Sequence, residues 1–266
     1  MSDFSTISTF YREKSLVQAS AGRQLMELLD IQPDADILDV GCGAGNLTTE
    51  LRELTSGRVA GIDPAEGMIR QSRELCAGKE IEFSVMSADE LPFVAEFDIL
   101  YCSSVFQWFS QPSAVLERFH RALRPAGRVG IQAPATRSYC PNFLRAIEHC
   151  RRVPRIDALF AGFRPPWHFR ETAGDYRLLF EQAGFRVPFS RIDEERQEYT
   201  VDQSLDVFRS GAAAGYLNQD CFSAPLPADF SAQLLQGIRE SFVAEANAAG
   251  RVELVFHRIY LVAEKE

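Results

Sequence analysis

The chain has 266 residues, with 28 basic and 37 acidic side chains, a formal net charge of −9 and 46% hydrophobic residues. This composition indicates a globular protein with a sizeable core and excludes a disordered chain. No run approaches the ~18–20 apolar residues of a membrane span, the first residues lack the basic and apolar regions of a signal peptide, and the acidic balance argues against a nucleic-acid binder. We therefore expect a cytoplasmic protein that binds neither membranes nor nucleic acids.

Strands and helices alternate along the first half of the chain. The expected strands lie at residues 37–40, 58–62, 81–85, 97–105 and 128–133. The expected helices lie at residues 4–30, 46–54, 66–76 and 113–123. Such alternation implies right-handed βαβ units, so we expect an α/β fold with a doubly wound, mainly parallel sheet.

After Pro134 the alternation breaks. Residues 135–170 are rich in proline between short helical stretches, which indicates an insertion lying over the edge or mouth of the sheet. The remaining expected helices are 171–182, 201–215 and 228–248, with strand-like parts in 187–200 and a last strand at 252–262.

The six cysteines favour free, buried thiols. None of them forms a CxxC pair, which a zinc site needs, and a disulfide framework is typical of small secreted chains. We expect no metal site.

The clearest local feature is a glycine-rich turn between the first strand and the helix after it. Glycines allow a tight turn and a close approach of backbone to ligand, and the helix start offers free N–H groups. Asp63 ends the next strand, where a carboxylate accepts both hydroxyls of a ribose. The order of these features predicts a site for a nucleoside cofactor. The spacing is GxGxG rather than the GxGxxG of dinucleotide enzymes, which disfavours a dehydrogenase.

Four runs of the sequence resemble the motifs of class I S-adenosylmethionine-dependent methyltransferases. They are ILDVGCGAG at 37–45, GIDP at 61–64, SADELPF at 87–93 and LRPAG at 123–127. The resemblance implies one methyltransferase domain over 1–266, with a seven-stranded Rossmann-like sheet whose last strand is antiparallel and a helical insertion after the fifth strand. Its parts would be an N-terminal helical cover (1–30), a cofactor-binding core (31–134), the insertion (135–170) and a C-terminal half with added helices and the last strand (171–266).

The same resemblance implies the cofactor, S-adenosylmethionine, its product S-adenosylhomocysteine and the residues that hold it. The glycines would line the methionine and ribose, Asp39 would orient the amino group, and Asp63 would hold the ribose. The full set of expected cofactor residues is Arg23, Asp39, Gly41, Gly43, Gly45, Asp63, Pro64, Met68, Ser87, Ala88, Asp89 and Ser103. Either Ser87 or Asp89 would take the adenine contact, because the usual acidic residue is a serine here.

The end of the fourth strand bears on the methyl acceptor. Its Phe106-Gln107-Trp108 triplet resembles the carboxyl O-methyltransferases of the trans-aconitate and malonyl-carrier-protein types. The alternative is that Phe106 and Trp108 are core aromatics. The expected substrate-binding residues are Tyr11, Gln107, Trp108, Arg137 and His168.

Charge is distributed unevenly along the chain. Residues 136–177 carry a net charge of +4 and the rest of the chain −13. A basic segment at the mouth of an acidic protein would steer an anionic substrate. The alternative is an arginine-rich face that pairs with acidic side chains.

These features predict a methyltransferase that modifies an oxygen of a small, anionic carboxylate, free or linked to an acyl carrier protein. A carboxylate, with a pKa near ~4, is already nucleophilic at neutral pH, so no catalytic acid or base is expected. The alternatives are transfer to a phenol, a quinone precursor or an amine, and a non-catalytic S-adenosylmethionine-binding regulatory protein. The oligomeric state is left open.

Overall fold

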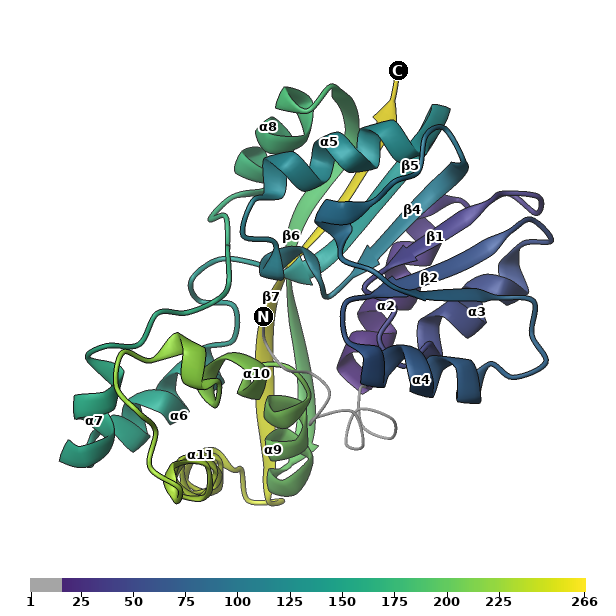
Figure 1. Cartoon of the computed structure of the whole chain (residues 1–266). Coiled ribbons are helices and arrows are strands. Elements are labelled where there is room, and N and C mark those ends of the chain that lie inside the picture. The colour runs from purple at the N-terminus through teal and green to yellow at the C-terminus, as the bar shows by residue number, and fades with distance from the viewer. Residues whose placement is uncertain (1–15) are drawn as a thin grey trace. The chain divides into compact units, whose positions relative to one another are not determined.

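The structure is a computed structural model that describes residues 16–266. Its seven strands form one mixed sheet in the order β3-β2-β1-β4-β5-β7-β6 (Figure 1). The strands are β1 (Ile37–Val40), β2 (Val59–Asp63), β3 (Glu82–Val85), β4 (Phe97–Ser103), β5 (Leu123–Pro134), β6 (Phe185–Thr200) and β7 (Arg251–Lys265). Strands β1 to β5 pair in parallel, whereas β7 runs antiparallel to β5. The predicted mainly parallel, seven-stranded sheet with an antiparallel last strand is confirmed.

The helices agree with the predicted ones to within a few residues. They are α2 (Leu16–Leu29), α3 (Asn46–Leu54), α4 (Glu66–Leu75), α5 (Pro112–Ala122), α6 (Pro141–Arg151), α7 (Pro154–Phe160), α8 (Ala173–Gln182), α9 (Val201–Ser210), α10 (Ala213–Tyr216) and α11 (Phe230–Glu245). Short 3-10 helices are η2 (Ala88–Glu90), η3 (Phe106–Trp108) and η4 (Gln219–Cys221). The expected helix at 4–30 begins before the described residues. Within them, no helix combines the length and the apolar character needed to cross a bilayer.

The chain divides into two compact units. The sheet unit consists of Leu16–Arg137, His168–Asp193 and Arg258–Glu266. The second unit, here called the helical unit, contains Ser138–Trp167 and Glu194–His257. The predicted insertion at 135–170 corresponds to only the first of these two segments. The division into an N-terminal cover, core, insertion and C-terminal half stays a prediction.

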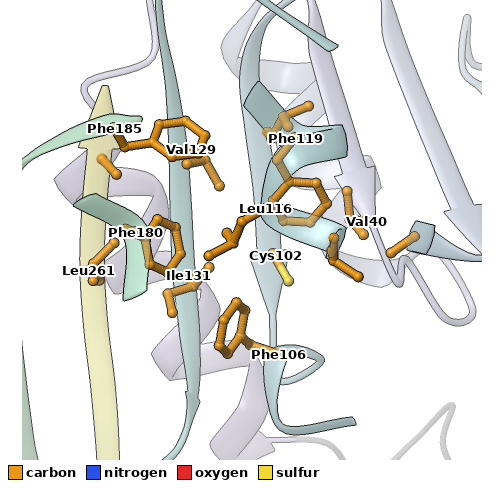
Figure 2. Packing of buried hydrophobic residues seen from close by; sticks show 14 of the residues in the cluster. Val40, Cys102, Phe106, Leu116, Phe119, Val129, Ile131, Phe180, Phe185 and Leu261 are labelled. Atoms are coloured by element: carbon orange, nitrogen blue, oxygen red, sulfur yellow. The ribbon is translucent and has the colours of Figure 1, made fainter. Parts of the chain in front are cut away.

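Both faces of the sheet unit are buried under helices, which explains why its strands are apolar without alternation. Leu38, Leu100 and Cys102 pack on the face that carries α5 and α8 (Figure 2). Ile37 and Tyr101 occupy alternate positions and pack on the opposite face with side chains of α2 and α3. The carboxyl ends of β1, β2, β4 and β5 therefore share one rim of a rigid layer.

Strand β5 begins five residues earlier than predicted. Leu123 already pairs with Phe97, and the register then shifts so that Arg128 pairs with Ile99. The residues between form an irregularity in which Ala126 has a φ of 62°. Pro125 lacks the N–H that a regular ladder needs, so the extra residues bulge out of the pairing instead of lengthening α5, which ends at Ala122 as expected.

An aromatic core holds the helical unit together. Phe143 of α6 meets Phe208 of α9 edge to face at 5.2 Å and Phe256 of β7 at 5.7 Å. Phe242 of α11 lies 6.1 Å from the same ring. The unit thus has a hydrophobic core of its own, in which Phe143 meets rings that stand 65 or more residues further along the chain.

Replacing Phe180 tests the packing of the sheet unit. Its side chain is fully buried and stacks on Phe106 at 5.7 Å, so Phe180→Ala should lower the free energy of unfolding by about 3–5 kcal/mol. Leu178→Ala on the same helix is the control, because Leu178 is 54% exposed. Urea denaturation of both variants gives the comparison, and equal losses would contradict the burial described.

Candidate functional site

The glycine turn between β1 and α3 is held in a conformation that only glycine adopts easily. Gly41, Gly43 and Gly45 have φ values of 75°, 53° and 84°. A Cβ on Gly41 would lie 2.3 Å from Cγ2 of Val105, which follows β4. The turn therefore leads into α3 and also packs closely against Val105, just after the end of β4.

Asp63, the last residue of β2, is bonded to this turn. Its Oδ2 accepts a hydrogen bond from the Gly43 N–H at 3.1 Å, and its Oδ1 accepts one from the Ala65 N–H at 2.8 Å. Burial raises the pKa of the Asp63 carboxyl, and the two N–H donors oppose that effect. Each carboxylate oxygen keeps lone-pair capacity for a further donor.

Asp39 lies buried in β1 directly before the turn. Its Oδ2 accepts a hydrogen bond from Thr48 Oγ1 at 2.6 Å. The pKa of Asp39 is raised to about 7, mainly by burial; the hydrogen bond from Thr48 opposes this rise, and the neighbouring charge of Asp63 contributes to it. Within the described residues neither carboxylate forms an ion pair. A buried and a half-buried carboxyl group beside one turn favour a positively charged ligand and disfavour a pyrophosphate.

The third motif meets the second at the end of β3. The Met86 N–H donates to the Asp63 carbonyl oxygen at 3.1 Å. Ser87 Oγ then donates to Asp89 Oδ1, so the two residues expected at the adenine are bonded to each other. Of the other residues expected there, Met68 and Ala88 are buried and Pro64 is exposed.

A second polar cluster lies at the carboxyl ends of β4 and β5. Gln132 Oε1 accepts hydrogen bonds from Ser103 Oγ at 3.2 Å and Ser104 Oγ at 3.1 Å. Gln107 Nε2 donates to the Ser104 carbonyl oxygen at 2.8 Å. The His168 N–H donates to the Gln107 carbonyl oxygen at 2.8 Å, which brings these two predicted substrate residues together.

Two members of this cluster, Ser104 and Gln132, were not among the predicted site residues. Gln132 stands in the second half of strand β5, where its neighbours at 129–131 and 133–134 are apolar, and it is fully buried there. A polar amide within a buried strand is the sequence signal that identifies such a position.

The two aromatic residues of the Phe106-Gln107-Trp108 triplet differ in burial. Phe106 is buried against Phe180 and meets Phe109 edge to face at 5.5 Å (Figure 2). Phe106 is thus a core aromatic, as the alternative interpretation held. Trp108 is only half-buried.

Two of the described site residues are not gathered with the others. The Arg23 guanidinium makes two hydrogen bonds, of 2.7 and 2.8 Å, to the Glu50 carboxylate. The Arg137 side chain is 93% exposed and lies 3.6 Å from Glu171. Tyr11 lies outside the described residues.

Most arginines of the basic segment 136–177 have acidic partners. Five of its eight arginines pair with carboxylates: Arg137, Arg145, Arg151, Arg155 and Arg177. Among the described side chains, Arg152, Arg164 and Arg170 make no ion pair. The excess positive charge of this segment is therefore largely compensated locally, which weakens the case for steering.

Residues 37–127 match the family model described as a methyltransferase domain. The chain is 25% identical over 271 residues to the malonyl-[acyl-carrier protein] O-methyltransferase of Acetivibrio thermocellus, covering 99% of this chain and 92% of that protein. This chain is an S-adenosylmethionine-dependent methyltransferase. Its cofactor is S-adenosylmethionine, as predicted.

One further similarity concerns the sequence and one concerns the fold. The methyltransferase is 28% identical over 269 residues to the trans-aconitate 2-methyltransferase of Paracidovorax citrulli, covering 96% of each. Its fold resembles that of an S-adenosylmethionine-dependent methyltransferase from Mesorhizobium loti with a TM-score of 0.53 and 16% identity, covering 91% of this chain and 96% of that one.

A pair of glycine substitutions tests the turn as the cofactor site. Gly41→Ala adds a Cβ that collides with Val105, so S-adenosylmethionine affinity should fall at least about tenfold by calorimetry. Gly78→Ala is the control, since Gly78 has a similar φ of 83° but no atom within 4 Å of the added Cβ. Equal affinities of the two variants would contradict the assignment, provided both retain the wild-type circular dichroism.

The ionisation of Asp39 makes stability depend on pH. The carboxyl ionises near 3.8 in the unfolded chain and near 7 in the folded one, so the folded state retains a proton that the unfolded state has lost. The unfolding free energy should therefore fall relative to Asp39→Asn as pH rises from about 4 to about 7. Urea denaturation across this interval tests it, and parallel curves for the two proteins would contradict it. A cationic ligand stabilises the ionised carboxylate, so S-adenosylmethionine affinity should rise over the same interval.

Proposed function

We propose that this methyltransferase transfers the methyl group to a carboxylate oxygen of a small anionic molecule. The observation that carries the proposal is the alignment over nearly the whole chain with relatives named for malonyl and trans-aconitate acceptors. Both acceptors bear free carboxylates. These alignments extend beyond residues 37–127, which match the methyltransferase family model.

The residues around the glycine turn fit the cofactor. We propose that Asp63 accepts hydrogen bonds from the ribose hydroxyls, that Asp39 faces the ammonium group, and that Gly41, Gly43 and Gly45 let the backbone approach the methionine and ribose. A ligand with sulfonium and ammonium charges complements the carboxyl groups of Asp39 and Asp63, which have no cationic partner among the described residues.

The other proposed cofactor contacts lie around this centre. They are Pro64, Met68, Ser87, Ala88, Asp89, Ser103 and Arg23. Arg23 reaches a methionine carboxylate only by giving up its bidentate pair with Glu50. Because that pair is exposed on the arginine side, its loss costs little.

On the acceptor side we propose roles for Gln107, Trp108 and His168, with Tyr11 and Arg137 completing the set. The bound cofactor supplies the methyl group on a positively charged sulfur. A carboxylate with a pKa near ~4 is already ionised at neutral pH, so the protein has no proton to remove. Its contribution is to align the carboxylate oxygen in line with the bond that breaks and to exclude water from the reacting atoms.

A screen with methyl-labelled S-adenosylmethionine tests the proposal. The acceptors are di- and tricarboxylates, malonyl thioesters on an acyl carrier protein, phenols, quinone precursors and amines. We expect label to be transferred to a carboxylate as an ester that alkali hydrolyses to volatile methanol. At saturating cofactor, turnover should vary little between about pH 6 and 8, because the acceptor stays ionised.

Three results would overturn the proposal. Turnover restricted to phenols or amines would reassign the acceptor class. A requirement for a base that titrates near neutral pH would contradict the mechanism. Tight cofactor binding with no methylated product across the screen would favour a regulatory protein. Gly41→Ala is the negative control for cofactor-dependent transfer.

A further inference from the structure

Two buried amide groups at the ends of β4 and β5 are only half satisfied. Gln107 is 6% exposed and Gln132 fully buried. Gln107 Oε1 accepts no hydrogen bond and Gln132 Nε2 donates none within the part of the chain that the structure describes. A buried polar atom without a partner is costly and rare in a folded protein. Two such atoms of opposite hydrogen-bonding character in one cluster therefore point to a missing partner.

Ser104 joins these two amides. Its carbonyl oxygen accepts from Gln107 Nε2 at 2.8 Å, its Oγ donates to Gln132 Oε1 at 3.1 Å, and its N–H donates to the Gln132 carbonyl oxygen at 2.6 Å. Because a carbonyl oxygen only accepts, the first of these bonds determines which end of the Gln107 amide remains unpaired. The unpaired acceptor of Gln107 and the unpaired donor of Gln132 thus belong to one hydrogen-bonded group.

The backbone of Ser104 supports a functional role for this group. Ser104 has a φ of 60°, in the left-handed region that residues with a side chain seldom occupy. Such strain persists where the surrounding structure enforces it, and it concentrates at binding sites. Here it allows Ser104 to direct its carbonyl oxygen and hydroxyl to the two glutamines at once.

The same group lies beside the cofactor turn. Val105, between Ser104 and the η3 helix, packs directly on Gly41, where an added Cβ would lie 2.3 Å away. The chain order reverses between β1 and β4, and ligands of open α/β sheets bind outside the strand ends at such a point. The two amides therefore lie next to the place where methyl transfer would occur.

We propose that Gln107 and Gln132 form an acceptor-binding pair that selects a carboxylate bearing a hydroxyl on the adjacent carbon. Gln132 Nε2 donates to one carboxylate oxygen and leaves the other for the methyl group. Gln107 Oε1 accepts the hydrogen bond of the hydroxyl. This inference rests on the proposed carboxylate methylation and specifies its substrate as a 2-hydroxy acid.

Glycolate and acetate are the probes, because they differ only in the hydroxyl. The full-length protein is saturated with S-adenosylhomocysteine, and the side-chain amide ¹H–¹⁵N signals of Gln107 and Gln132 are assigned by through-bond correlation. Each probe is then titrated while these signals are followed. We expect both signals to move with glycolate, and its Kd to be at least about threefold lower than that of acetate, the size expected from one additional hydrogen bond.

Substitutions separate recognition by this pair from other effects. Gln107→Met keeps the length of the side chain but removes the acceptor, so glycolate and acetate should then bind equally. Gln182→Met, an exposed residue at the end of α8, is the control and should retain the preference for glycolate. The wild-type titration remains decisive if Gln107→Met fails to fold.

The outcomes distinguish this inference from the proposed function. Equal affinities for the two probes, or signals that move with neither probe, would overturn the inference and indicate that a bridging water satisfies the two amides. A preference that survives in Gln107→Met would also overturn it. If any of these results is obtained while the acceptor screen shows turnover of carboxylates, the inference is rejected and the proposed function is retained. The converse outcome is also distinguishable. If Gln107→Met loses the preference for glycolate but the acceptor screen shows turnover of phenols alone, the two glutamines still form a binding pair and carboxylate methylation is rejected.

Discussion

The hydrogen bond between the Gly43 N–H and Asp63 Oδ2 ties the turn after β1 to the end of β2. Neither partner occupies its position by local preference alone. The turn needs glycines with positive φ, and the carboxylate is held in a buried place where its ionised form is disfavoured. Once made, the bond gives the carboxyl ends of two neighbouring strands one common geometry, and the ligand-facing groups of both strands depend on it.

Electrostatics around this turn give the site its selectivity. Asp39 stands two residues before Gly41, and Asp63 is hydrogen-bonded to Gly43. Both carboxyl groups have raised pKa values because burial penalises their charge. A bound cation stabilises the ionised carboxylates and so offsets the cost of burying their charge, whereas a pyrophosphate would repel them. In the proposed site, the two carboxyl groups beside the turn and the GxGxG spacing therefore both favour a sulfonium cofactor over a dinucleotide.

The net positive charge of the basic segment at 136–177 suggests steering of an anionic substrate, but most of its arginines form ion pairs within the fold. Arg145 pairs with Glu245 and Arg155 with Asp229, acidic partners that stand about 70–100 residues further along the chain. A count of charge along the sequence assigns these arginines to one segment and their carboxylates to another. Folding brings them together within the helical unit. At the end of β4, Ser104 is hydrogen-bonded to the neutral amides of Gln107 and Gln132.

The sequence by itself determined the strands β1 to β5, the helices between them, the cofactor and the position of Asp63, because each of these depends on short-range patterns. Apolar runs of strand length, GxGxG and a terminal aspartate are legible without tertiary information. The tertiary structure decided which side chains meet. The pairing of Arg23 with Glu50 and the grouping of residues 138–167 with 194–257 follow from packing between segments that are separated in the sequence. Gln132 shows the difference most clearly. In the sequence it is one polar residue in a strand, and it becomes half of a candidate acceptor site only because β5 lies beside β4, where Ser104 links it to Gln107.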